Sequence, residues 1–263
     1  MKLHIWFLCF SGLFIAQSVA AVEVDGLFKA QVSVSSQSRE DRNKALGEAL
    51  QIVISRLTTG NEFTQNPAVK SALENAATYV DQYQYAQTAR VTGAKSPAIL
   101  RVSFNQDAIM AFMCHSGLAV WGGNRDKTLL WLVIEQRGKQ AFLDVEQNVE
   151  IVSELQQAFQ ANSMPLLLPL MDLEEKQAIS VKELLAPDAE KVLAVSARYD
   201  VATILTGKLV KQRTCWRSEW ALHLDNKVER WSNACADLKT SLELAMQQVY
   251  QHLSTYYAGL ACH

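Results

Sequence analysis

The second half of the chain contains three short runs of almost only apolar residues, separated by segments with helical character. The runs cover residues 128–134, 165–171 and 201–205, and helices are expected at 149–161 and 187–198. Strands this short and this apolar are typical of a parallel sheet with helices on both faces, because each strand is buried on two sides. The pattern therefore predicts an α/β module.

An antiparallel hairpin follows the third apolar run. Residues 216–224 alternate as a strand does, a polar turn begins at Asp225, and a second strand continues to residue 234. Folding at this turn brings Cys215 and Cys235 nearly opposite each other, so we predict a disulfide between them. The hairpin should extend the sheet in antiparallel fashion, and a last helix is expected at 238–257.

The tryptophans of the hairpin divide between two faces. Trp216, Trp220 and Leu222 share one face by the two-residue period of a strand, which predicts a core position; an exposed binding patch is the alternative. Trp231 is expected on the opposite face, together with Cys235. Trp231 is therefore a candidate for an exposed binding residue.

The first half predicts a smaller α+β module. It combines an extended segment, two helices, a strand pair and a short third helix, at residues 22–34, 39–57, 67–80, 83–91 with 98–104, and 105–115. The fold class is thus α+β in the first half and α/β in the second, which has a mixed sheet with parallel strands, flanking helices and a C-terminal antiparallel hairpin.

The chain divides into four segments. We assign residues 1–20 to an export signal, 21–116 to an N-terminal α+β module, 117–127 to a glycine-containing linker and 128–263 to a C-terminal α/β module. Trp121 is expected to pack at the linker, and Arg125 to pair with an acidic residue across it.

The first twenty residues have the layout of a secretory signal peptide. Lys2 precedes an apolar run at 5–16, and Ser18 and Ala20 supply the small residues that precede a cleavage site after Ala20. An uncleaved anchor is the alternative, although the run is short for a bilayer span. We expect export, most simply to a bacterial periplasm, and no transmembrane segment after cleavage.

Export to an oxidising compartment makes disulfides expected. Besides the Cys215–Cys235 pair, the exported chain keeps Cys114 and Cys262, for which a second bridge and two free thiols are both open. The net charge of −2 argues against a nucleic-acid partner, which requires a basic surface, and the 49% hydrophobic content argues against a disordered chain.

Five motifs in a fixed order resemble one family, the domain of unknown function 2066 (DUF2066) family of exported proteins of Gram-negative bacteria. They are centred on SREDRNKAL at 38–46, NPAV at 66–69, VWG at 120–122, MPLLLPLMDLE at 164–174 and RYD at 198–200. The resemblance implies a location in the cell envelope and no known chemistry.

The sequence contains no pattern that indicates catalysis. No histidine stands beside a plausible nucleophile, and the spacing of metal-ligand motifs is missing, so we expect no catalytic residue, metal or cofactor. Glu135 and Asp172 each follow a predicted strand. Ligands bind beyond the carboxyl ends of strands in open parallel sheets, which makes these two carboxylates candidates for a polar site. The alternative is that Asp172 belongs to a solvated loop.

These observations favour a non-catalytic periplasmic binding or assembly protein that docks onto a cell-envelope complex, with strand addition at exposed edges of the first half. One alternative is an accessory component of a secretion or motility machine at the outer membrane. Another is a periplasmic hydrolase or ligand-binding protein that uses the sheet end near Glu135 and Asp172.

Overall fold

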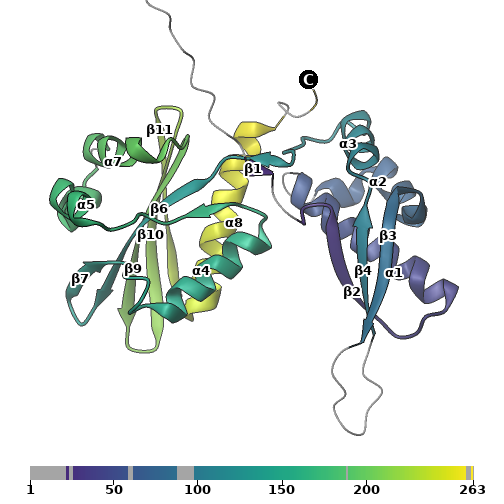
Figure 1. Cartoon of the computed structure of the whole chain (residues 1–263), viewed down its shortest axis with the longest axis horizontal. Helices are drawn as coiled ribbons and strands as arrows, with labels where there is room; N and C mark the ends of the chain where they lie inside the picture. The colour runs from purple at the N-terminus through teal and green to yellow at the C-terminus, as the bar shows by residue number, and fades with distance from the viewer. Residues whose placement is uncertain are drawn as a thin grey trace, which may run out of the picture.

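The structure is a computed structural model that describes residues 22–23, 26–58, 62–87, 98–187, 189–258 and 262. The expected signal peptide lies outside these residues. Within the described part of the chain, no helix is long and apolar enough to cross a membrane. Two sheets, each with its own helices, lie side by side (Figure 1). We call residues 26–120 the N-terminal half, and residues 121–258 together with Cys262 the C-terminal half.

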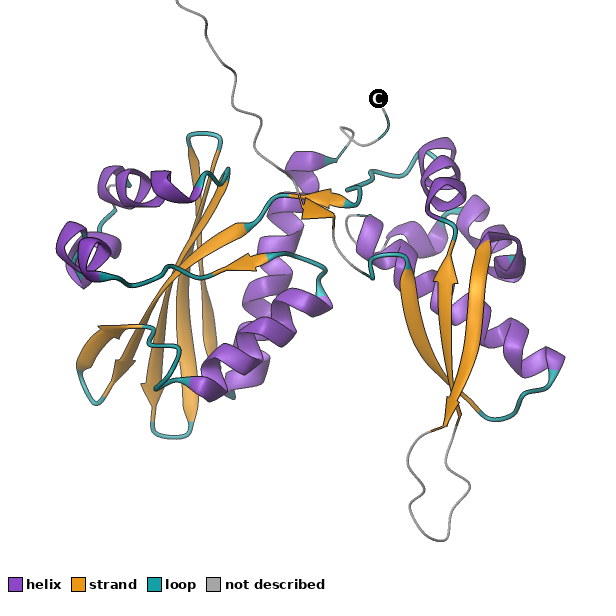
Figure 2. Cartoon of the chain, in the orientation of Figure 1, coloured by secondary structure: helices purple, strands orange, loops and turns teal. Residues whose placement is uncertain are grey.

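The N-terminal half is built on a three-stranded antiparallel sheet. Its order is β2 (Lys29–Val34), β4 (Ala98–Phe104) and β3 (Val80–Gln87), so β2 and β3 are the edge strands. Strand β3 begins at Val80, three residues before the start of the expected strand at 83–91. Residues 88–91 of that expected strand lie outside the described part. Helix α1 (Arg39–Leu57) covers one face of the sheet, behind the strands in Figure 2.

Side-chain caps explain where the helices of this half begin. The side chain of Ser38 accepts a hydrogen bond from the Asp41 amide at the start of α1. Asn66 caps α2 (Pro67–Glu74), which has Pro67 in its first turn, and Asn105 caps α3 (Gln106–His115). Two short 3-10 segments, η1 (Glu62–Gln65) and η2 (Ala76–Tyr79), flank α2.

The core of the N-terminal half lies between α1 and the sheet. Leu50, Val53 and Ile54 of α1 are fully buried, as is Leu100 in the central strand β4. The opposite face of the sheet is polar where it meets solvent, since Gln31, Arg101 and Gln84 are exposed. Among the described residues, helices thus cover only the α1 side of this sheet.

The C-terminal half contains a six-stranded mixed sheet in which β6 (Thr128–Gln136) and β9 (Thr203–Gln212) run parallel. The order is β11-β10-β9-β6-β7, and β8 also pairs with β6. The remaining strands are β7 (Lys139–Phe142), β8 (Leu166–Leu167), β10 (Cys215–Leu224) and β11 (Lys227–Ala236). As predicted, the fold is α+β with parallel and antiparallel pairings.

Helices cover both faces of this sheet. Leu130 and Leu132 of β6 pack toward α4 (Val149–Ala161) and α8 (Leu238–Tyr257). The alternate residues Leu129 and Trp131 pack into a second cluster with α5, α6 and α7. These three short helices are α5 (Leu173–Ala178), α6 (Val181–Leu184) and α7 (Glu190–Ser196), followed by η3 (Ala197–Tyr199). The expected parallel strands buried on two faces are present.

Several element predictions for this half were incomplete. The run at 165–171 forms only the two-residue strand β8, since Pro169 has no amide hydrogen to donate and Met171 has a φ of 52°. The third strand continues to Gln212, because β9 pairs with β10 as well as with β6. Strands β9, β10 and β11 therefore form a three-stranded antiparallel meander, and the hairpin extends the sheet in antiparallel fashion as predicted.

The prediction for Trp231 was wrong about its face. Trp231 lies directly opposite Trp220 in the β10–β11 pairing, so both indoles point to the α8 side. A bulge between Trp216 and Ser218 shifts the register before Cys235 is reached. Counting in twos from Cys235 across this bulge therefore assigned Trp231 to the wrong face.

Candidate functional site

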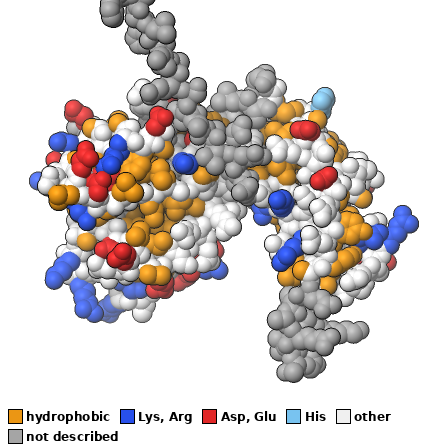
Figure 3. All heavy atoms as spheres, viewed as in Figure 1, with side chains coloured by type: hydrophobic (Ala, Val, Ile, Leu, Met, Phe, Trp, Pro, Cys, Tyr) orange, Lys and Arg blue, Asp and Glu red, His pale blue; other side chains and the backbone are white. Residues whose placement is uncertain are grey.

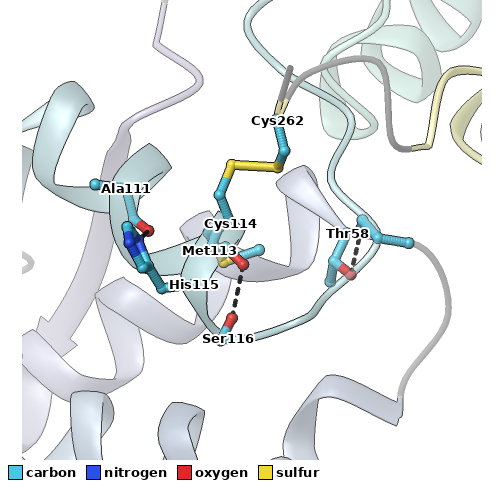
Figure 4. The surroundings of a disulfide bond; sticks show 8 residues. Thr58, Ala111, Met113, Cys114, His115, Ser116 and Cys262 are labelled. Atoms are coloured by element: carbon cyan, nitrogen blue, oxygen red, sulfur yellow. Dashed lines mark hydrogen bonds between the residues drawn. A yellow bond between two sulfur atoms is a disulfide. The ribbon is translucent and has the colours of Figure 1, made fainter.

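The predicted Cys215–Cys235 disulfide is present and joins the open end of the β10–β11 hairpin. The turn of the hairpin is two residues long, and Asp225 and Asn226 both have positive φ values. The second bridge, which the sequence left open, is also formed. It links Cys114 near the end of α3 to Cys262, which follows the last helix (Figure 4).

The two halves are also joined by a buried arginine. Arg125 lies in β5 (Asn124–Arg125), a two-residue strand within the expected linker. Strand β5 pairs with β1 (Val22–Glu23). Its side chain is fully buried, and its guanidinium carbon lies 4.0 Å from the centre of the Trp121 ring. Trp121 packs at the join, as expected.

In the described part of the chain Arg125 forms no ion pair with an acidic residue, which corrects the sequence-based expectation. Its guanidinium donates to five main-chain carbonyl oxygens, those of Arg56, Trp121, Gly122, Asn162 and Ser163. Arg56 lies in the last turn of α1, and Asn162 and Ser163 follow α4. The carbonyl groups at a helix C-terminus carry partial negative charge, so two helix ends replace the carboxylate. Burial lowers the pKa of Arg125 to about 10, which leaves it charged at neutral pH.

A cleft of about 800 Å³ opens beside this join. One wall comes from β2 and α1, including Lys29, Gln31 and Arg56, and the other from α4 and β8, including Phe159 and Leu166. Figure 3 shows the space between the two halves below the join, with Lys and Arg side chains along the N-terminal side. The join thus fixes the two walls of a groove of the size that ligand sites have.

Strand β2 presents its free edge to this cleft. The amide of Phe104 donates to the carbonyl oxygen of Phe28, and hydrogen-bonded pairs then alternate along the β2–β4 register. Main-chain groups of Ala30 and Val32 therefore point toward β4, and those of Lys29, Gln31 and Ser33 point outward. The guanidinium of Arg56 donates to the outward carbonyl oxygen of Lys29 at 2.7 Å.

The cleft is electrostatically positive. Lys29 is exposed and Arg56 half-buried, and in the described ranges neither forms an ion pair. Burial lowers the pKa of Arg56 but leaves it a cation. The side chains that line the cleft include these two cations and three glutamines, and none of the lining residues that the structure describes is acidic. Such a groove favours an anionic occupant.

Glu135 lies near the end of β6 and is held by two neighbours. Its carboxylate forms a 2.8 Å ion pair with Lys208 of β9 and accepts a 2.7 Å hydrogen bond from Gln140 of β7. The hydrogen bond from Lys208 lowers the pKa of Glu135 most, and that from Gln140 contributes as well. The group is therefore a cross-strand ion-pair partner.

Asp172 has a different set of partners. It is the N-cap of α5, accepting from the Glu175 amide at 2.9 Å, and it forms a 2.9 Å ion pair with Arg198. The hydrogen bond from the Glu175 amide is the main reason that the pKa of Asp172 is lowered. Buried Glu175 joins the same cluster through Tyr199. Because Glu135 and Asp172 share no partner, these contacts do not bring the two carboxylates into one site.

Trp231 is half-buried against the core of the C-terminal half. Its ring lies 5.4 Å from the ring of His252 on α8, at an interplanar angle of 30°. The sequence analysis did not find the free edge of β2 as a candidate site. That edge borders a cleft whose two walls come from residues more than 120 positions apart, such as Gln31 and Phe159, and no local sequence pattern indicates such a cleft. Across the described positions, no cluster of three or more potential metal-ligating side chains is found.

The described geometry defines a two-part α+β protein with a basic cleft between its halves. Residues 21–122 match the model of a family described as a domain of unknown function (DUF8605). This match covers the N-terminal half, and it is to a family other than the DUF2066 family that the five motifs resemble. A search of curated proteins finds no match to the chain.

Three solved structures show distant similarity. The LpoB C-terminal domain from Salmonella enterica aligns at 10% identity over 50% of this chain and 95% of its own, with a TM-score of 0.29. A competence-damaged protein (CinA) superfamily member from Enterobacter cloacae aligns at 10% identity over 65% and 99%, with a TM-score of 0.28. The corresponding protein from Escherichia coli aligns at 14% identity over 57% and 87%, with a TM-score of 0.27. All three TM-scores are below 0.5.

Proposed function

We propose that this chain is a non-catalytic protein of the Gram-negative periplasm that docks onto a cell-envelope complex. The observation that carries the proposal is the open three-stranded sheet of the N-terminal half, in which β2 and β3 are both edge strands. Free strand edges bind extended segments of partner proteins through main-chain hydrogen bonds, and the fixed join beside β2 provides a rigid surface for such a contact.

Two further observations support an exported location. Disulfides persist in oxidising compartments, and this structure has two of them, one of which links its two halves. The five motifs that resemble the exported DUF2066 proteins point to the same compartment. The contacts of Glu135 and Asp172 give no support to the hydrolase alternative, because each carboxylate is already paired with a cation.

The test is cross-linking in intact cells that produce an affinity-tagged copy, followed by mass spectrometry of the purified product. We expect a stoichiometric envelope complex that is missing when the tag alone is exported by the same signal. An Asp172→Ala copy should yield the same complex, since Asp172 is an N-cap residue distant in sequence from the sheet edges. Recovery of the monomer alone, in repeated experiments, would contradict the proposal.

A further inference from the structure

The outward groups of β2 form the unused half of a strand pairing. Gln31 and Ser33 each direct an amide and a carbonyl group away from β4, and both residues are exposed. Among described residues, no main-chain partner is recorded on this side of either one. Two donors and two acceptors are therefore available to an extended segment placed along β2.

The residues that line the cleft also indicate which side chains an added segment would carry. Ile52 and Arg56 lie one helical turn apart on α1 and both line the cleft, beside the α1-facing side of β2. Four residues of helix rise about 6 Å, close to the spacing of alternate residues in a strand. An added strand can therefore place an acidic side chain beside Arg56 and an apolar one, two residues away, beside Ile52.

The charges that line the cleft favour a partner segment with acidic side chains. Among the described residues, Lys29 and Arg56 are the cations that line the cleft and no acidic residue lines it, while the chain as a whole has a net charge of −2. Arg56 uses one guanidinium nitrogen for the carbonyl oxygens of Gly26 and Lys29, and no other hydrogen bond from this side chain is recorded within the described ranges. Its other nitrogen atoms can therefore donate to an incoming carboxylate.

We propose that an extended acidic segment of the partner protein adds to β2 as a fourth strand, inside the cleft between β2 and α4. This inference rests on the proposed function and specifies where the partner binds and what chemistry it presents. The partner segment alternates acidic and apolar residues on the side that faces α1. The wall formed by Phe159, Met164 and Leu166 limits how far the widened sheet can extend.

The experiment uses the full chain purified from a periplasm with its disulfides intact. The probe is an acetylated, fluorescein-labelled peptide of nine residues in which threonine alternates with glutamate or valine, and the comparison peptide has lysine in place of glutamate. We expect the glutamate peptide to bind at least about ten-fold more tightly, the effect of one charge-assisted hydrogen bond. On binding, the amide protons of Gln31 and Ser33 should exchange more slowly with solvent, as measured by NMR.

Three variants locate the contact. Gln31→Pro removes an outward amide and leaves the pairing with β4 unchanged, so it should weaken peptide binding by about ten-fold. Tyr83→Pro is the matched control, since Tyr83 occupies an outward position on the other edge strand, β3, and this variant should bind normally. Lys29→Glu changes only an exposed side chain and should also weaken binding, which preserves the test if Gln31→Pro fails to fold.

Equal binding of the two peptides, no binding up to about 1 mM, or an equal effect of the two proline variants would overturn this inference. Those results leave the proposed function standing if cross-linking in cells still captures an envelope complex. Loss of the complex in cells would instead count against the proposed function, whatever the peptide does.

Discussion

The phenol hydroxyl of Tyr250 donates a 2.8 Å hydrogen bond to the main-chain carbonyl oxygen of Thr58, 192 residues earlier in the chain. Tyr250 belongs to the last helix of the C-terminal half, and Thr58 is the C-cap residue of α1 in the N-terminal half. Arg125 donates to the carbonyl oxygen of Arg56 in the same helix end. The end of α1 is therefore a point at which the two halves are joined by hydrogen bonds, in addition to the Cys114–Cys262 disulfide.

Removing the hydroxyl should weaken this connection without altering the packing. Tyr250→Phe keeps the ring but leaves the buried Thr58 carbonyl without its donor, so we expect a loss of about 1–2 kcal/mol in the free energy of unfolding. Urea unfolding measures this change. Tyr83→Phe, at an exposed tyrosine, is the control and should change stability by less than about 0.5 kcal/mol. Equal stability of the two variants would show that the bond is not stabilising.

Arg125→Met should have a larger effect. Five main-chain carbonyl oxygens lose their donor when the guanidinium is removed, and the methionine side chain fills most of the same space. We expect a loss of about 3–5 kcal/mol, as for other groups left unpaired by deletion of a buried charged partner. Calorimetry measures it, with Arg217→Met on the exposed side of β10 as the control. A shift no larger than that of the control would contradict this account of the join.

Much of the fold follows from the sequence, and the reasons are local. The bounds predicted for α1, α4 and α8 agree with the structure, since apolar periodicity marks all three helices and the side-chain caps Ser38 and Asp237 mark the starts of α1 and α8. Trp231 was assigned to the wrong face because a β-bulge leaves no mark in the pattern of apolar residues. The partners of Arg125 could not be predicted, because they are main-chain groups that any residue type could supply.

The two disulfides should stabilise the protein to different extents. In the chain-entropy model the stabilisation grows with the length of the closed loop, and the two pairs are separated by 148 and 20 residues. The estimates are about 5 kcal/mol for Cys114–Cys262 and about 3 kcal/mol for Cys215–Cys235. We expect serine replacement of both cysteines of either pair to lower the melting temperature under oxidising conditions. An unchanged melting temperature for either double variant would refute the corresponding value.

His223 should make stability depend on pH. Burial is the main cause of its lowered pKa, with Arg230 adding like-charge repulsion, and within the described part of the chain its buried Nδ1 atom has no hydrogen-bond partner. The unfolded chain therefore binds a proton more readily than the folded one. Stability is fully present above the unfolded pKa of about 6.5 and is lost as the pH falls from there toward the folded pKa.

The corresponding measurement is the melting temperature between about pH 7.5 and pH 5, the range that brackets the histidine pKa. His223→Leu should flatten this dependence, because the buried titrating group is gone. His115→Gln removes an exposed histidine and should leave the dependence as it is in the parent protein. Parallel curves for the parent protein and His223→Leu would rule out His223 as the cause.

Gly207 lies in the central strand β9, directly between Leu132 of β6 and Trp220 of β10. A Cβ atom at this position would overlap the Trp220 ring and approach Leu132 Cδ1 to 2.9 Å, so the indole lies where any other residue would place its side chain. We expect Gly207→Ala to cost about 1–3 kcal/mol by overpacking, measured by urea unfolding. Gly123→Ala is the control, since its Cβ would meet Leu27 Cδ2 at an ordinary 3.7 Å. In a Trp220→Leu background the added methyl group has room, so the cost of Gly207→Ala should shrink there, and an unchanged cost would show that the indole is not what requires glycine.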